Sequence, residues 1–527
     1  MLPRVGVVLK KFSRLTTGLA LAVVSALALA GCVGSPVVAP SPGTGSVPAE
    51  YAPFYTQQLN WVGCGEALQC ASAKAPVDWA KPTGATMSLS LIRHVATSSD
   101  RLGSLFVNPG GPGGSGVAFV RDSLDYAVDK KVQANYDVIG FDPRGVGAST
   151  PVTCVSSAAE MDQWIYGLNS QPRFSPAWLA EREADAQKYA ANCAQKTGEL
   201  LFHVDTVSAA KDLDMLRAAV GDSVFNYLGY SYGTLLGATY AELFPTRVGR
   251  MVLDGALDPA SSGTEVLETQ AVGFENALSN YLRWCFQQKQ CPFTSTGAGH
   301  PGTAPTEAEL SSARSRISQL LAALDKSPLT GTDGRKLGAD TMVTAIITPL
   351  YSATQWPALT SIFSSVAGGK ADAALASADS YNNRVNGKYL DNSSEAFTAV
   401  NCVDYPVTTS KSEWAATAAT LEKASPVFGP YLAYGDVLCA AWPAKSTRTP
   451  AAVKAVGSPD ILVVGTTGDP ATPYQWAVNL AKELPNGHLL TYVGEGHTAY
   501  NKGSMCVNDV VDAYLLSGRV PVTDAKC

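Results

Sequence analysis

Short apolar runs that each end in Gly, Asp or Pro constrain this chain more than any other feature. They lie at 103–111, 136–145, 224–233, 249–259, 460–470 and 488–497. Runs of about four to six residues rich in Val, Ile, Leu, Phe and Tyr are typical of strands buried on both faces of a sheet. Helical patterns lie between them, for example at 206–221 and 234–245. The sequence therefore predicts an α/β fold with a mostly parallel sheet.

The strand–helix alternation stops at about residue 260 and resumes near 460, and the stretch between is rich in helical patterns. With 527 residues, 46% of them hydrophobic, the chain can bury a large core. We therefore expect a core built from residues 51–259 and 456–527, interrupted by a large helical cap at 260–455.

The N-terminal segment has the pattern of an export signal. An apolar stretch too short to span a membrane follows four basic residues, Arg4, Lys10, Lys11 and Arg14. It ends in Leu29-Ala30-Gly31-Cys32, which resembles a bacterial lipobox. We predict a lipoprotein signal peptide at 1–31 and a lipid on Cys32. Ordinary secretion with a chance cysteine is the alternative. Residues 32–50 are rich in Pro, Gly and Ser, and we expect a flexible tether from the membrane surface.

The chain has eleven cysteines, and ten remain when Cys32 is set aside. An even number in an exported chain predicts disulfides, although the sequence alone does not fix their connectivity. Pairing sequence neighbours closes five loops without crossing, so we expect Cys64–Cys70, Cys154–Cys193, Cys285–Cys291, Cys402–Cys439 and Cys506–Cys527. Metal binding is the alternative, but no CxxC pair or Cys/His cluster supports it, and we expect no metal.

A G-x-S-x-G pattern is formed by Gly229, Ser231 and Gly233. The pattern alone is weak, because a glycine-rich chain of this length produces it by chance. Its context is stronger, since an apolar run precedes it and a helical pattern follows, as a nucleophile elbow requires. We therefore predict that Ser231 is a catalytic nucleophile. The alternative is a tight turn with an inert serine.

An activated serine needs a base and an acid that orients it, and in this fold their chain order is Ser, acid, His. Of the five histidines, His497 alone follows a predicted strand late in the chain, on a glycine-flanked turn. Asp469 follows the strand before it and is the preferred acid. Its rivals are Asp254, which also follows a strand, and Glu495, which is very close to His497 in sequence.

Acyl transfer also needs N–H donors for the oxyanion. The glycine-rich segment 108–116 follows an early strand and can present backbone N–H groups, and the N–H of Tyr232 is the expected second donor. A phosphate-binding loop is excluded, because no Lys-Ser/Thr ends the segment, and no clean dinucleotide fingerprint is present. We expect no cofactor. The net charge of −6 argues against nucleic acid as a partner.

Five motifs occur together: NPGGPG, GFDPRGVGAS, GYSYGT, GDPATP and GEGH. In this order they resemble the secreted actinobacterial tripeptidyl aminopeptidases, relatives of the proline iminopeptidases within the α/β-hydrolase fold. The resemblance runs from about residue 55 to 527, and mycobacterial envelope-anchored members share the lipobox. It implies a triad of Ser231, Asp469 and His497. It also implies that Gly111 is an oxyanion donor, in a motif where Pro109 replaces the histidine of the iminopeptidases.

The resemblance implies a serine peptidase that acts at peptide N-termini, on the outer face of the cell membrane or secreted. Recognition of a free amino group would need a carboxylate, and Glu275 and Asp404 are candidates from the cap. Thr472, in the DPATP motif, is a candidate for holding the acid loop. A carboxylesterase or lipase with the same triad is the alternative enzyme, and a non-catalytic envelope binding protein is a third possibility.

Overall fold

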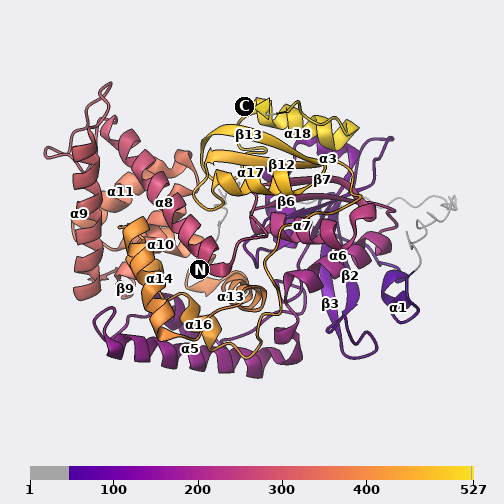
Figure 1. Ribbon diagram of the computed structural model, residues 1–527, viewed down its shortest axis with the longest axis horizontal. Coiled ribbons are helices and arrows are strands. Elements are labelled where there is room, and N and C mark those ends of the chain that lie inside the picture. Colours follow the sequence, from indigo (N-terminus) through magenta and orange to yellow (C-terminus); the bar gives the residue numbers. More distant parts are fainter. Residues whose placement is uncertain (1–46, 524) are drawn as a thin grey trace, which may run out of the picture.

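The computed structural model describes residues 47–523 and 525–527 (Figure 1). The predicted signal peptide, the lipidation site Cys32 and most of the predicted tether lie outside the described residues. Within the described part of the chain, no helix has the length and apolar character needed to cross a membrane.

A ten-stranded sheet forms the centre of the core, in the order β1-β2-β3-β5-β4-β6-β7-β12-β13-β14 (Figure 1). In this order, the strands from β5 to β14 pair in parallel with one another, whereas β1, β2 and β3 form an antiparallel edge, and β3 also pairs antiparallel with β5. Their bounds are β1 Val62–Gly65, β2 Leu68–Pro76, β3 Thr86–His94, β4 Ser104–Asn108, β5 Asp137–Phe141, β6 Phe225–Tyr230, β7 Val248–Asp254, β12 Ile461–Gly468, β13 Gly487–Glu495 and β14 Ala525–Lys526. The six apolar runs of the sequence correspond to β4, β5, β6, β7, β12 and β13.

Helices cover both faces of the sheet, which is why its central strands are apolar throughout. One face packs against α2 (Gly116–Ala127), α3 (Lys130–Asn135) and α18 (Met505–Ser517). The other packs against α1 (Ala52–Tyr55), α6 (Thr206–Ala219), α7 (Tyr232–Leu243) and α17 (Tyr474–Glu483). Successive residues of one strand face opposite layers, as with Leu105 and Phe106 of β4.

The chain leaves the sheet after β7 and returns at β12, and the residues between form a helical layer with its own core (left in Figure 1). Its helices are α8 Gly263–Phe286, α9 Glu307–Lys326, α10 Ala339–Leu350, α11 Trp356–Ala367, α12 Asp372–Tyr381, α13 Ser393–Asp404, α14 Lys411–Ala424, α15 Gly429–Leu432 and α16 Asp436–Ala440. Two short hairpins accompany them, β8 (Leu329–Thr330) with β9 (Lys336–Leu337) and β10 (Arg384–Val385) with β11 (Lys388–Tyr389). This is the region for which the sequence predicts a cap.

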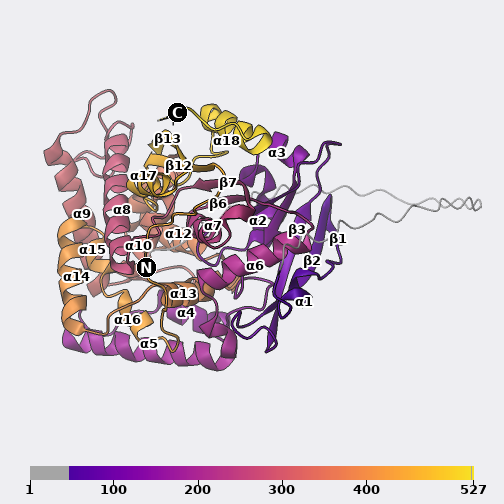
Figure 2. The same cartoon turned by 45° about the vertical axis from the view of Figure 1, so that its right-hand side comes forward.

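A second inserted segment contributes to the cap. Helices α4 (Ala158–Tyr166) and α5 (Pro176–Thr197) leave the sheet after β5, and α5 runs along the base of the molecule in both views (Figures 1 and 2). Ala186 of α5 packs with Trp414 and Val437 of the cap. The predicted first core segment, 51–259, therefore includes helices that pack against the cap.

The ten cysteines of the described residues form five disulfides between sequence neighbours. The pairs are Cys64–Cys70, Cys154–Cys193, Cys285–Cys291, Cys402–Cys439 and Cys506–Cys527. Each bond closes a loop within one region, and the sequence separations range from 6 to 39 residues.

Candidate active site

Ser231 lies at the turn from β6 into α7, with φ 56° and ψ −126°. Few residues other than glycine adopt a positive φ, so this backbone stores strain. Its neighbours leave no room for side chains. A Cβ on Gly229 would lie 2.5 Å from the carbonyl oxygen of Gly233, and one on Gly233 would lie 2.8 Å from Asn108 Oδ1. Gly229 and Gly233 are thus required because neighbouring atoms lie too close to these positions to admit a side chain.

His497 and Asp469 form a hydrogen-bonded pair at the ends of β13 and β12. The ring Nδ1 lies 2.9 Å from each carboxylate oxygen of Asp469, and both side chains are buried. The hydroxyl of Thr472 donates to Asp469 Oδ2 at 2.9 Å and lies 3.2 Å from His497 Nδ1. The structure therefore brings together three of the residues that the sequence singles out.

The carboxylate of Asp469 also accepts backbone hydrogen bonds from its own loop and from the histidine loop. Ala471 N and Thr472 N donate to Oδ1 at 2.9 and 2.8 Å, and Thr498 N donates to Oδ2 at 3.1 Å. These donors, together with the Thr472 hydroxyl, fix the orientation of the carboxylate. It is therefore suited to orient an imidazole through Nδ1.

The two rival acids have other partners. The carboxylate of Asp254 accepts from the backbone N–H groups of Ala499 and Tyr500, and its carbonyl accepts from Ser231 N at 2.9 Å. Asp254 thus joins the serine turn to the loop that follows His497. The carboxylate of Glu495 accepts instead from the side-chain amide of Asn280.

A cap residue holds the histidine loop from the opposite side. The carbonyl of Tyr351, just after α10, accepts a hydrogen bond from His497 N at 2.9 Å. The two rings also meet edge to face, with centroids 5.4 Å apart. Cap and core therefore share the positioning of His497.

The glycine-rich loop after β4 packs directly against the serine turn. A Cβ on Gly110 would lie 2.9 Å from Ser231 Cβ and 3.1 Å from Tyr232 N. Among the described residues, the N–H groups of Gly111 and Tyr232 have no hydrogen-bond acceptor, and both residues line the pocket that contains Ser231. These two donors have the chemistry of an oxyanion hole.

The Ser231 pocket, with a volume of about 70 Å³, lies between the core and the cap. Its lining is mostly apolar, and Thr472 forms part of it. The described residues around it are Gly111, Pro112, Ser231, Tyr232, Leu257, Gly263, Val266, Leu267, Gln270, Phe397, Asn401, Tyr405, Val407, Asp436 and Thr472. Asp436 is the only one of these with a charged carboxylate or basic group.

Glu275 and Asp404, the carboxylates proposed from the sequence for binding an amino group, are not brought to this pocket. Glu275 is buried in the cap, where Oε2 accepts from Ser425 Oγ at 2.9 Å and Val427 N at 3.1 Å. Asp404, the last residue of α13, is buried and accepts from Thr206 N and Oγ. Burial raises the pKa of Asp404 to about 7. Both acids join helices within the fold, so the structure does not support their proposed role.

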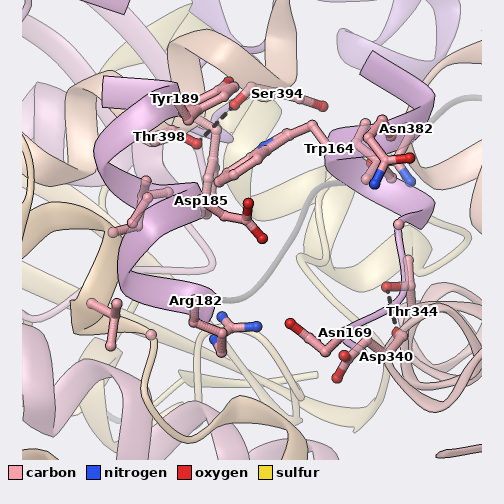
Figure 3. Close-up of a pocket in the computed structure, with 18 of the residues that line it drawn as sticks. Trp164, Asn169, Arg182, Asp185, Tyr189, Asp340, Thr344, Asn382, Ser394 and Thr398 are labelled. Atoms are coloured by element: carbon pink, nitrogen blue, oxygen red, sulfur yellow. Dashed lines mark hydrogen bonds between the residues drawn. The ribbon is translucent and has the colours of Figure 1, made fainter. Parts of the chain in front are cut away.

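A larger cavity of about 600 Å³, which Figure 3 shows, shares one lining residue with the Ser231 pocket. Its walls come from α4 and α5, from α10 and α13, and from the segment around α15 and α16. Arg182 and Asp185 of α5 lie on one side of it, and Asp340 on the other (Figure 3). Phe397 of α13 lines both spaces, so this ring forms part of the wall between them.

Two residues of the site, Tyr351 and Asp436, carry no recognisable signal in the sequence, whereas Gly110 lies in the NPGGPG motif without a predicted role of its own. Gly110 is one of several glycines in its loop, and its contact with Ser231 follows from the packing of two loops. Tyr351 and Asp436 belong to the cap, where no motif marks them. Comparison of the cap positions among homologues could identify such residues. Among the described residues, no group of three or more His, Cys, Asp or Glu side chains is arranged to hold a metal ion.

The fold and this site define a serine hydrolase of the α/β-hydrolase fold. The family model described as TAP-like protein matches residues 425–527. Serine protease Hip1 of Mycobacterium tuberculosis is 37% identical over 518 residues, covering 95% of each chain. Carboxylesterase B of the same species is 36% identical over 519 residues, covering 94% of this chain and 95% of the relative. Tripeptidyl aminopeptidase of Streptomyces lividans is 33% identical over 486 residues, covering 89% of this chain and 86% of the relative.

The chain belongs to the TAP-like family of serine hydrolases. The resemblance to tripeptidyl aminopeptidases expected from the five motifs is therefore confirmed, as is the α/β-hydrolase fold.

Proposed function

We propose that the protein is a serine peptidase that hydrolyses peptide bonds near free N-termini. The observation that carries this proposal is the pair formed by His497 and Asp469, linked through Asp254 to the strained turn of Ser231. The pair and the turn lie beside a capped pocket. The relatives named serine protease and tripeptidyl aminopeptidase support a peptide substrate.

The reaction proceeds through an acyl-enzyme. Ser231 Oγ attacks the scissile carbonyl carbon while His497 Nε2 takes the hydroxyl proton, and Asp469 holds the opposite ring nitrogen in the protonated tautomer. The N–H groups of Gly111 and Tyr232 donate to the oxygen on which negative charge develops. The imidazolium then protonates the leaving amine. A water molecule attacks the ester in the second half, again losing its proton to His497.

The cap explains why cleavage would be confined to chain ends. The Ser231 pocket is small and enclosed by α8 and α13, whereas the adjoining cavity is several times larger. A short N-terminal segment would occupy the small pocket, and the rest of the peptide would extend into the larger space. A polypeptide that extended beyond the Ser231 pocket at both ends would collide with the cap.

The first test is Ser231→Ala. We expect loss of hydrolysis by at least about 10³-fold, with an unchanged thermal unfolding midpoint, because the change removes one oxygen from the nucleophile. A fluorophosphonate probe should label the parent protein at Ser231 and leave the variant unlabelled. Substantial hydrolysis by the variant would exclude this mechanism.

The second test concerns the substrate's N-terminus. A tripeptide p-nitroanilide with a free amino group should be cleaved with a higher kcat/KM than the same substrate after N-acetylation. Equal values would exclude recognition of the free N-terminus and would favour an endopeptidase or an esterase.

Ester hydrolysis is the second candidate, because the same triad cleaves esters and one relative is named Carboxylesterase B. The two candidates are separated by comparing kcat/KM for a tripeptide p-nitroanilide with that for a p-nitrophenyl ester of a short fatty acid. The peptidase proposal requires efficient release of nitroaniline. An enzyme active on the ester alone would establish the alternative.

We also propose that the protein is exported and tethered by a lipid on Cys32. The lipobox pattern at 29–32 and the disulfides support this proposal. In bacteria that process lipoproteins, metabolic labelling with a fatty-acid analogue should tag the parent protein and not Cys32→Ala. Labelling that persists in the variant would contradict the assignment.

A further inference from the structure

Asp436 places a charged carboxylate in the pocket that contains Ser231. It is the first residue of α16 and faces this pocket, whereas its neighbours Gly435 and Val437 line the larger cavity. The remaining described lining of the Ser231 pocket is apolar or neutral. A carboxylate in such surroundings is costly unless a cation pairs with it.

The Asp436 carboxylate lacks a partner in the part of the chain that the structure describes. No described residue donates a hydrogen bond to it or forms an ion pair with it, although it is partly buried. Burial raises the pKa of the Asp436 carboxyl group above its ordinary value. Among the described residues, none supplies a positive charge that would compensate this burial. A carboxylate of this kind in a cleft beside a nucleophile is typical of a functional site.

The other acids near the site each have partners within the fold. Asp469 is bound by His497 and by several backbone N–H groups. Asp404 and Glu275 Oε2 accept hydrogen bonds from groups within the fold, whereas Glu275 Oε1 is buried in the cap without a hydrogen-bond partner and lies outside the lining of this pocket. Asp436 is thus the acid of the pocket whose charge remains to be paired.

We propose that Asp436 binds the α-ammonium group of the peptide substrate, an inference that rests on the proposed function. The ammonium group is a compact cation with three N–H donors, and it would compensate the carboxylate in a pocket of low polarity. An acylated N-terminus lacks this charge and would leave the carboxylate unpaired. Asp436 would therefore determine specificity for free N-termini.

An ammonium group bound at Asp436 would also limit the length of the released peptide. An extended chain advances at most about 3.3–3.6 Å per residue, so three residues would place the ammonium group about 10 Å from the scissile carbonyl. An ammonium group fixed at Asp436 would thus set which peptide bond reaches Ser231. The lining of the pocket by both residues is consistent with one short peptide contacting both.

The test compares Asp436→Asn with the parent enzyme on three p-nitroanilides. These are a tripeptide of alanine with a free N-terminus, its N-acetyl derivative, and an N-acetyl tripeptide that carries one lysine. Glu422→Gln is the matched control, because Glu422 is an exposed acid on α14 and the change removes the same charge from the cap. Circular dichroism and the rate of fluorophosphonate labelling verify the fold and the reactivity of Ser231.

We expect Asp436→Asn to lower kcat/KM for the free tripeptide by about 10- to 100-fold, mainly through KM. The values for the acetylated substrates and the labelling rate should stay within about twofold, and Asp436→Glu should restore part of the loss. The control should match the parent enzyme on all three substrates.

Three results would overturn the proposal. The first is an unchanged preference for the free N-terminus in Asp436→Asn, and the second is an equal loss on free and acetylated substrates. The third is a loss confined to the lysine-containing substrate, which would assign Asp436 to a side-chain ammonium group. By contrast, a parent enzyme that is labelled by the probe but cleaves no peptide would refute the proposed peptidase function itself.

Discussion

At the scale of single residues, the site is organised by backbone N–H groups as much as by side chains. The strained turn fixes Ser231, and the Asp469 carboxylate is held by N–H groups from two loops. Such pre-organisation is required because the groups must be in place before the transition state forms. Substitutions here should therefore act on kcat more than on stability.

Asp469→Asn tests the role of the acid. We expect kcat to fall by about 10³- to 10⁴-fold, because an amide can donate to Nδ1 and favour the wrong histidine tautomer. The measurement is kcat on a tripeptide p-nitroanilide, with the thermal unfolding midpoint as the control for folding. Activity within tenfold of the parent enzyme would exclude Asp469 as the acid that orients His497.

Thr472 is expected to be a positioning residue, since its hydroxyl contacts both Asp469 and His497. Thr472→Val keeps the shape but removes the hydroxyl, and we expect kcat to fall by about 10- to 100-fold with little change in KM. Thr472→Ser retains the hydroxyl and should keep most of the activity. If the serine and valine variants behave alike, the hydrogen bonds of Thr472 have no part in catalysis.

The triad candidates can be proposed from the sequence because each follows a strand, and parallel strands bring their carboxyl ends to one edge of the sheet. Ser231, Asp469 and His497 follow β6, β12 and β13 in this way. Asp436 has no such relation to the sheet. Its place in the pocket depends on how the helices of the cap pack, and local sequence patterns do not encode that packing.

At the scale of elements, α13 connects the cap to the serine turn. A Cβ on Gly113 would lie 2.8 Å from the carbonyl oxygen of Ser393, so the start of α13 contacts the glycine-rich loop directly. At its other end, Asp404 accepts from Thr206 at the start of α6, and the Thr206 hydroxyl also contacts Tyr232 OH. The position of α13 is thus coupled to both proposed oxyanion donors.

The burial of Asp404 makes a prediction about pH. Burial raises its pKa from 3.8 to about 7 in the folded protein. Between these values the folded state binds the proton and the unfolded state does not, so the contribution of Asp404 to stability falls as pH rises from about 4 to about 7. We expect the free energy of unfolding to decline over this window by at most about 1.4 kcal/mol per pH unit from this group.

Asp404→Asn isolates that contribution, because the amide does not titrate and can still accept from Thr206 N. Urea unfolding at several pH values between 4 and 8 should show that the stability of the parent protein, relative to the variant, decreases as pH rises. A difference that is constant with pH would mean that Asp404 titrates at its ordinary value in the folded state.

The sequence predicts individual helices and strands better than it predicts which of them pack together. Composition identifies the six central strands β4, β5, β6, β7, β12 and β13, because burial on both faces leaves continuous apolar runs, and periodicity identifies α6 and α7. The amphipathic helices α4 and α5 fit a core or a cap equally well from their sequence. Their place beneath the cap is decided by contacts such as Ala186 with Trp414, which join residues far apart in the chain.

At the scale of the whole molecule, a rigid sheet carries the nucleophile, and a separate helical layer closes over it (Figures 1 and 2). The cap supplies Tyr351 against His497 and Asp436 to the pocket. The geometry of the site therefore requires that core and cap keep their relative position. Disulfides stabilise regions of both, and they differ greatly in the length of the loop that each closes.

The Cys402–Cys439 bond joins α13 to α16 and closes a loop with a separation of 37 residues, whereas Cys64–Cys70 spans 6 residues at the sheet edge. On the chain-entropy model, removing the longer loop should cost about 4 kcal/mol and the shorter about 2 kcal/mol. The double variants Cys402→Ala/Cys439→Ala and Cys64→Ala/Cys70→Ala form a matched pair, measured by urea unfolding under the same non-reducing conditions.

Because α13 and α16 carry Phe397 and Asp436, the Cys402→Ala/Cys439→Ala variant should also weaken discrimination between free and acetylated tripeptides. Equal destabilisation with unchanged discrimination would show that the cap wall keeps its geometry without this cross-link.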